Sequence, residues 1–309
     1  MLKKVMVSGA NGFVGFAVVK ELIRQGIEVT ALVHHQQNRL DSLNTCLLKL
    51  VSCDMKDYST LPQHLDHDYD AFFHFAWLGS AGEGRFDPSQ QMLSIQASLD
   101  ACSCAQALGC KTFIGVGSIM EDETLEVIHQ KGTVLGKAYL YGSAKVSAHL
   151  LTQARASALG IQHIWPKITN AYGPGETSPR FINSTLRKLL NHEPLEFTSG
   201  TQNYDFIFID DVACAFVACA QSGKDQTSYV LGSGHAQALR HYVEQMGQVI
   251  DSTQKLNFGS IPYGGVQLDV SMFSIDALTQ DTGFVPHVSF EEGILKTYQW
   301  IKGEHHAEV

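Results

Sequence analysis

Charged residues are scarce in this chain of 309 amino acids. Asp, Glu, Lys and Arg make up 17%, against roughly 25% in an average soluble domain. A coiled coil needs far more of these residues, and a hydrophobic share of 44% excludes a disordered chain. The 22 basic residues are outnumbered by 31 acidic ones, for a formal net charge of −9. Nucleic-acid binding requires a basic surface that replaces phosphate counterions, so we do not expect a nucleic-acid partner.

Long apolar runs and paired cysteine motifs are also missing. A membrane span needs about 18 consecutive apolar residues, and none occurs, so no membrane partner is expected. The basic start of the chain leads into an apolar stretch too short for a signal peptide. Seven cysteines, an odd number without a Cys-x-x-Cys motif, indicate reduced thiols. Together these features predict a cytoplasmic protein.

Two familiar catalytic motifs are absent. Without Gly-x-Ser-x-Gly, a hydrolase with a nucleophile elbow is not expected. Without His-Glu-x-x-His, a zinc protease is not expected either. The histidine pairs His64/His67 and His305/His306 lack a third ligand nearby in the sequence, so we predict no metal site.

Short apolar runs alternate with helical periodicity in the first half of the chain. We expect strands at 5–7, 27–33, 47–51, 71–75, 112–116 and 161–166, and helices at 16–25, 88–108 and 139–159. Uniformly apolar strands separated by helices are typical of a parallel sheet covered on both faces. The pattern therefore predicts an α/β fold with a Rossmann-type, doubly wound parallel sheet. Such a sheet also explains the low charge, because its strands have no polar face.

The pattern changes after about residue 170, where glycine and proline mark an irregular segment. Helices are expected at 181–190, 210–220, 241–250 and 290–301, and strands at 205–209 and 229–231. We therefore predict a dinucleotide-binding domain over 1–170, with a return segment at about 204–222. Residues 171–309 are predicted to form a smaller C-terminal α/β lobe that binds substrate.

A glycine-rich turn joins the first strand to the first helix. Gly9, Gly12 and Gly15 recur at every third position there. Glycine lets the backbone approach a pyrophosphate, and the helix N-terminus offers unpaired N–H groups with partial positive charge. The turn predicts a dinucleotide-binding loop, although a plain glycine-rich turn has the same composition.

The end of the second strand bears on the choice of cofactor. In NAD-binding folds of this type a carboxylate there binds the ribose 2′-hydroxyl. This chain has His34 and His35 instead, with Arg39 shortly after. The absence of an acid at this position and the presence of a nearby cation favour NADP over NAD, unless Arg39 is simply a surface residue.

Tyr141 and Lys145 lie four residues apart, hence on one face of the predicted helix 139–159. Ser118 follows the fifth strand, so all three are expected at the carboxyl edge of the sheet. A free phenol has a pKa of about 10, and a neighbouring ammonium group favours its ionised form. A second pair with this spacing, Tyr298 and Lys302, precedes a polar tail and is attributed to chance.

The Gly-x-x-Gly-x-x-Gly turn followed by Ser118, Tyr141 and Lys145 resembles the short-chain dehydrogenase/reductase superfamily. The form GANGFVG is similar to its extended branch, the NAD-dependent epimerase/dehydratase family, which acts largely on nucleotide sugars. The resemblance implies that Tyr141 transfers a proton, that Ser118 holds the same oxygen, and that Asp54 contacts adenine. The predicted cofactor site comprises Gly9, Asn11, Gly12, Phe13, Val14, Gly15, His34, Arg39, Asp54, Met55, Phe75, Ala76, Trp77, Tyr141, Lys145 and Ile168.

Departures from the family pattern restrict the reaction. The family's sugar 4,6-dehydratases carry Asp-Glu directly after the serine position, where this chain has Ile119 and Met120. Neither side chain can transfer a proton, so dehydration is not expected. The acids at 121–123 come too late for that register and are interpreted as a solvated loop.

The resemblance also implies a substrate site. It places Asn170 and Met120 against the substrate, and Tyr204 where many members carry an arginine for the nucleotide diphosphate. Arg180 and Arg187 are the candidates to supply that charge, and each could equally be a surface residue.

The sequence thus predicts an NAD(P)-dependent enzyme acting at C4 of a nucleotide-activated sugar. A 4-ketoreductase and a 4-epimerase need the same Ser-Tyr-Lys set, so both stay open. A non-catalytic NAD(P)-binding regulatory protein of the same fold is the alternative. By analogy with the family, the last helix and the helix before Leu108 could form a homodimer face.

Overall fold

The computed structural model describes residues 2–34, 39–130 and 134–307. Its centre is an eight-stranded sheet in the order β12-β7-β5-β4-β1-β2-β3, with β6 beside β7. Its strands are β1 (Lys4–Ser8), β2 (Glu28–Val33), β3 (Leu48–Ser52), β4 (Ala71–His74), β5 (Thr112–Ile114), β6 (Gly117–Ser118), β7 (Gln162–Ile168) and β12 (Thr227–Leu231). All neighbouring strands of this sheet pair in parallel, which confirms the predicted doubly wound α/β fold.

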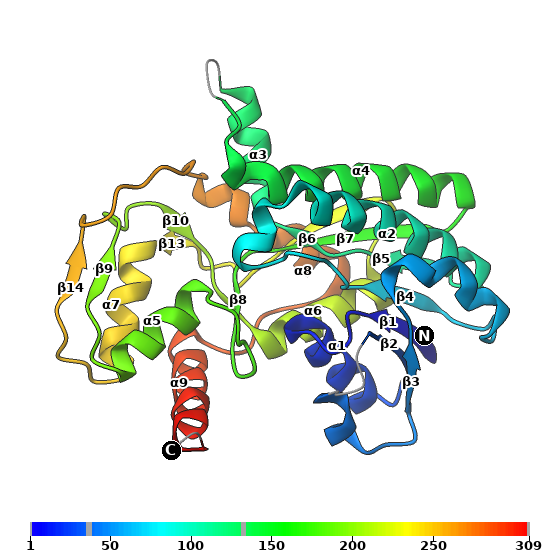
Figure 1. Ribbon diagram of the computed structural model, residues 1–309, viewed down its shortest axis with the longest axis horizontal. Coiled ribbons are helices and arrows are strands. Elements are labelled where there is room, and N and C mark those ends of the chain that lie inside the picture. The colour runs from blue at the N-terminus through cyan, green and yellow to red at the C-terminus, as the bar shows by residue number, and fades with distance from the viewer. Residues whose placement is uncertain (1, 35–38, 131–133, 308–309) are drawn as a thin grey trace.

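Helices cover both faces of the sheet (Figure 1). α1 (Phe13–Arg24) and α6 (Ile209–Ser222) pack together on one face, and α2 (Pro88–Ala107) and α4 (Leu140–Leu159) on the other. The central strands are buried between these layers; Val5, Met6 and Val7 of β1 have no exposed surface. Two-sided burial of the strands is the expected origin of the low charge.

The direction of winding reverses at β1, because the chain passes through β2 and β3 and then returns to β4 on the other side. Ligands bind at such a switch point, beyond the carboxyl ends of the strands. The turn from β1 to α1 lies at this edge, and the segments that follow β4 and β6 begin there.

The second half builds a smaller set of elements beside the sheet (Figure 1). Its helices are α5 (Phe181–Leu190), α7 (Leu239–Val249) and α9 (Phe290–Ala307), whereas α8 (Asp276–Thr282) packs on α6 and β12 of the large sheet. Its short strand pairs are β8 (Ala171–Tyr172) with β11 (Ile207–Phe208), β9 (Leu195–Phe197) with β14 (Leu256–Phe258), and β10 (Asn203–Tyr204) with β13 (Gln237–Ala238). An aromatic cluster joins these segments, with Tyr242 4.9 Å from Phe206 and 4.7 Å from Phe290 between ring centroids. The division into a 1–170 domain and a 171–309 lobe remains a prediction.

Short 3-10 helices complete the chain: η1 (Arg39–Leu43), η2 (Met55–Gln63), η3 (Gly82–Phe86), η4 (Lys137–Tyr139) and η5 (Val270–Phe273). Between residues 2 and 307, outside the two internal gaps, no helix is both long and apolar enough to cross a bilayer.

One predicted loop is a helix. The acids interpreted as a solvated loop open α3 (Met120–His129), and two of them, Glu121 and Asp122, are buried. Three successive acids followed by apolar residues at 125, 127 and 128 are typical of a helix N-terminus, where negative charge meets the positive end of the dipole. This signal could have revealed α3 from the sequence.

Candidate active site

The glycine turn brings the backbone close to the end of β4. Gly9 has a φ of +64°, and a Cβ atom built on it would lie 2.6 Å from the backbone nitrogen of Ala76. A Cβ on Gly15 would fall on the carbonyl oxygen of Gly9. These positions accept no side chain, so the α1 N-terminus stays open to a ligand. This geometry fits a dinucleotide pyrophosphate.

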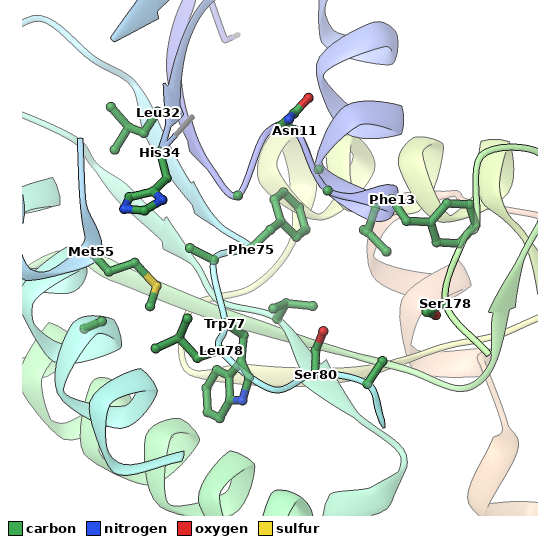
Figure 2. A pocket seen from close by; sticks show the side chains of 18 of the residues that line it. Asn11, Phe13, Leu32, His34, Met55, Phe75, Trp77, Leu78, Ser80 and Ser178 are labelled. Atoms are coloured by element: carbon green, nitrogen blue, oxygen red, sulfur yellow. The ribbon is translucent and has the colours of Figure 1, made fainter. Parts of the chain in front are cut away.

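A cavity of about 980 Å³ extends from this turn across the carboxyl edge of the sheet (Figure 2). Apolar side chains such as Phe75 and Met55 form much of its wall, and His34 and Asn11 lie at its rim. Every residue predicted for the cofactor lines this cavity: Gly9, Asn11, Gly12, Phe13, Val14, Gly15, His34, Arg39, Asp54, Met55, Phe75, Ala76, Trp77, Tyr141, Lys145 and Ile168. The structure thus gathers them in one place, and cofactor contact itself remains a prediction.

Two polar pairs mark the end of the cavity beside β2 and β3. His34 Nε2 lies 3.0 Å from an oxygen of Asp54. The backbone N–H of Lys56 donates to Asp54, and this bond lowers the pKa of the Asp54 carboxyl. Arg39 is held by its backbone N–H, which donates to Asn11 Oδ1 at 2.9 Å. Its guanidinium lies 4.3 Å from the ring centre of Phe16.

Tyr141 and Lys145 come from the first turns of α4 and meet Ser118 at the end of β6. Lys145 Nζ donates to the carbonyl of Val116 at 2.9 Å and lies 5.8 Å from the ring centre of Tyr141. It also lies 3.5 Å from the ring centre of Trp77. Burial lowers the pKa of Lys145 to about 7. Burial raises the pKa of Tyr141, while Arg85, Arg180 and a bond from Ser118 act in the opposite direction.

Glu121 fixes the backbone of Ser118 through a hydrogen bond. Its side chain is 2% exposed and accepts hydrogen bonds from the Ser118 backbone N–H at 2.9 Å and from Trp165 Nε1 at 3.0 Å. His149 Nδ1 lies 3.2 Å from its other oxygen. The interpretation of 121–123 as a solvated loop was therefore wrong, because Glu121 is a buried acceptor that holds the end of β6.

A second cavity of about 320 Å³ adjoins the first at Ser118. Three predicted substrate residues line it: Met120, Asn170 and Arg180. Asn170 Nδ2 donates to the carbonyl of Asp205 at 3.0 Å, and Arg180 pairs with Glu176 at 3.2 Å.

The fourth predicted substrate residue, Arg187, is not part of this site. Arg187 lines neither cavity, and its guanidinium pairs with Glu304 of α9 at 2.7 Å. Its place inside α5, with an acid opposite on α9, could not be deduced from chain position. The second Tyr-Lys pair, Tyr298 and Lys302, is also on α9 and lines neither cavity.

The sequence missed three charged residues of the smaller cavity. Arg85 of η3 and Glu123 of α3 line it together with Tyr204, and so does Glu176, the partner of Arg180. Burial raises the pKa of Glu123 to about 7. Glu123 lies one helical turn after Met120, on the same face of α3, a relation visible only once α3 is identified.

Comparison with known proteins agrees with this geometry. The family model described as "NAD dependent epimerase/dehydratase family" matches residues 5–232. The chain belongs to this family. Membership confirms the resemblance and the prediction of an NAD(P)-dependent nucleotide-sugar enzyme, and the family description names NAD. The relatives of this chain include epimerases, reductases and dehydratases, so membership does not distinguish among these reactions.

Three relatives in this comparison each share less than a quarter of their aligned residues with this chain. A CDP-abequose synthase of Salmonella muenchen is 23% identical over 297 residues, covering 95% of this chain and 96% of the relative. A dTDP-4-dehydro-6-deoxy-D-allose reductase of Streptomyces is 24% identical over 261 residues, covering 77% and 78% of the two chains. At the level of the fold, a UDP-N-acetylglucosamine 4-epimerase of Methanobrevibacter ruminantium matches with a TM-score of 0.81 and 23% identity, covering 98% and 99%.

Proposed function

We propose that this enzyme oxidises or reduces C4 of a nucleotide-activated sugar, as a 4-ketoreductase or a 4-epimerase. One observation carries the proposal: Ser118, Tyr141 and Lys145 meet where the cofactor cavity adjoins a smaller cavity of sugar size. Ser118 lines both cavities, so its hydroxyl can hold a substrate oxygen beside the cofactor. The distant relatives named above act on nucleotide sugars, which supports this substrate class.

The residues of the site provide proton transfer and charge. When bound, a nicotinamide dinucleotide would supply the hydride acceptor or donor. Tyr141 takes the proton from the C4 hydroxyl on oxidation, or returns it to the C4 carbonyl on reduction. Ser118 donates to the same oxygen. Lys145 is fixed by Val116 and supplies a positive charge beside the Tyr141 ring when it is protonated.

A dehydratase is not proposed. Met120 lines the substrate cavity at the register where the family's dehydratases carry an acid, and a thioether cannot transfer a proton. Curated relatives of this chain include enzymes with 4,6-dehydratase activity, so product analysis is needed to test this point. Loss of water from the sugar would contradict the proposal.

Arg39 is the residue that should determine whether the site prefers NADP or NAD. The family description favours NAD, whereas a guanidinium in the cavity and no acid at the end of β2 favour NADP. We propose that Arg39 contacts a ribose 2′-phosphate. Substituting Arg39→Ala should then weaken NADP binding and leave NAD binding unchanged, as measured by titration calorimetry. Equal losses for both cofactors would contradict this role.

The reductase and epimerase are separated by cofactor balance. Purified protein is first screened by thermal shift against NAD, NADP and UDP-, dTDP-, GDP- and CDP-sugars, because a ligand of the folded state raises its stability. Steady consumption of the reduced cofactor with a 4-keto sugar nucleotide identifies a reductase. Conversion of a 4-hydroxy sugar without net cofactor change identifies an epimerase. Neither reaction with any bound sugar nucleotide would leave the non-catalytic regulator as the better account.

A further inference from the structure

Arg85 extends from η3, after β4, over the catalytic tyrosine. Its guanidinium carbon lies 4.5 Å from the ring centre of Tyr141, closer than the 5.8 Å of Lys145 Nζ. The side chain lines the smaller cavity with Ser118 and Asn170. If C4 of the sugar reacts at Tyr141 as proposed, Arg85 lies beside that carbon.

The N–H groups of Arg85 lack an acidic partner. In the described part of the chain, no carboxylate lies within 4.0 Å of this guanidinium, and its one hydrogen-bond acceptor is the thioether of Met120. Stacking on Tyr141 engages the face of the guanidinium and leaves its N–H edge available. By contrast, Arg180 and Arg187 each have a carboxylate partner.

Glu123, an acid of the same cavity, does not neutralise the charge of Arg85. Glu123 lines the same cavity without forming an ion pair to Arg85 within 4.0 Å. Burial raises the pKa of Glu123 to about 7, so a large share of it is uncharged near neutral pH. Arg85 is half-buried, and a guanidinium withdrawn from water without an acidic partner is costly, a cost that an anionic ligand removes.

We propose that Arg85 binds an acidic substituent of the sugar, so that the substrate is a nucleotide-activated sugar acid. This inference rests on the proposed reaction at C4. In a pyranose ring, C1 carries the nucleotide diphosphate and lies opposite C4. The carboxylate of a hexuronic acid is attached to C5, the ring neighbour of C4. A cation stacked on the tyrosine that serves C4 is thus closer to a C5 carboxylate than to the diphosphate, and its planar fork matches a carboxylate.

Binding measurements test this assignment without requiring turnover. UDP, UDP-glucose and UDP-glucuronate are titrated calorimetrically into wild-type protein and into Arg85→Gln and Arg85→Lys, each saturated with its cofactor. We expect the wild type to bind UDP-glucuronate at least about tenfold more tightly than UDP-glucose, since hydrogen bonds to charged groups contribute this much. Arg85→Gln should abolish the preference without changing UDP affinity, and Arg85→Lys should restore part of it.

Arg155→Gln is the matched control, because Arg155 is exposed on α4, where it donates to Ser103 of α2, and lines neither cavity. Cofactor affinity verifies that each variant is folded. Equal wild-type affinities for the two sugar nucleotides would overturn the inference and leave the C4 reaction intact. Equal weakening of all three ligands by Arg85→Gln would assign Arg85 to the diphosphate and also overturn it. Failure of the wild type to bind any of the three would count against the proposed substrate class as well.

Discussion

Removing the charge of Glu121 should destabilise both the fold and the end of β6. The Glu121 carboxylate accepts buried hydrogen bonds from Ser118 N–H and Trp165 Nε1, at 2.9 and 3.0 Å. In Glu121→Gln, one acceptor oxygen becomes an NH₂ donor facing other donors. Hydrogen bonds to charged groups contribute about 1.5–3 kcal/mol each, so losing one or two predicts a cost of about 1.5–6 kcal/mol. The substitution retains the side-chain volume, so no cavity adds to this cost.

The assay is chemical denaturation followed by circular dichroism, with the free energy of unfolding compared among variants. Glu126→Gln is the control, because Glu126 is exposed on the same helix and should change stability by less than about 0.5 kcal/mol. The Glu121 variant should also lose kcat, since Ser118 is no longer fixed. A Glu121→Gln protein as stable as the Glu126→Gln control would refute the role of Glu121 as a buried acceptor.

Three further predictions concern the loop, the lysine and the second acid. Gly15→Ala should abolish cofactor binding, because the new Cβ would clash with the Gly9 carbonyl oxygen. Gly303→Ala is the control, since its Cβ would have no atom within 4 Å and cofactor binding should not change; cofactor titration compares the two variants. The stability of the ligand-free protein should rise with pH between about 7 and 10.5, the folded and ordinary pKa values of Lys145, because the unfolded chain binds the extra proton there. The free energy of unfolding should rise by at most about 1.4 kcal/mol per pH unit. Denaturation at several pH values should show this rise in the wild type and not in Lys145→Met. Glu123, with a pKa of about 7, ionises as pH rises, so UDP-glucuronate should bind more weakly at about pH 8 than at about pH 6. Lys145, whose pKa is also about 7, loses its positive charge over the same interval and weakens anion binding in the same direction. Glu123→Gln should therefore reduce that dependence in calorimetry; an unchanged dependence would contradict the role of Glu123.

The cofactor side of the molecule could be predicted because its determinants are local. The Gly9–Gly15 turn follows from glycine spacing between a strand and a helix, and the Tyr141–Lys145 pair follows from helical periodicity. These signals lie within a few residues of one another, and the parallel sheet brings the separate segments to one edge. Family membership agrees with the prediction made from those residues.

The substrate side could not be predicted as well, because its residues depend on tertiary contacts. Arg180 and Arg187 could not be distinguished as substrate residues from the sequence. Of the two, Arg180 lines the cavity, whereas Arg187 forms an ion pair with Glu304 of α9. Arg85 lies in a short 3-10 helix without periodicity, and its position over Tyr141 depends on how two distant segments pack. The buried position of Glu121 depends on α3 packing against Ser118 and Trp165, and the motif register at 119–120 carries no information on that packing.

The role of Tyr141 is the most direct test of the proposed function. Turnover of the sugar nucleotide found in the ligand screen should be measured for the wild type, for Tyr141→Phe, and for Tyr298→Phe, which changes the other Tyr-x-x-x-Lys pair on α9. We predict that Tyr141→Phe retains cofactor binding and loses at least about a hundredfold in kcat, the contribution of a positioned proton donor. Tyr298→Phe should keep the wild-type rate. Unchanged turnover in a folded, cofactor-binding Tyr141→Phe protein would contradict the assignment of this site.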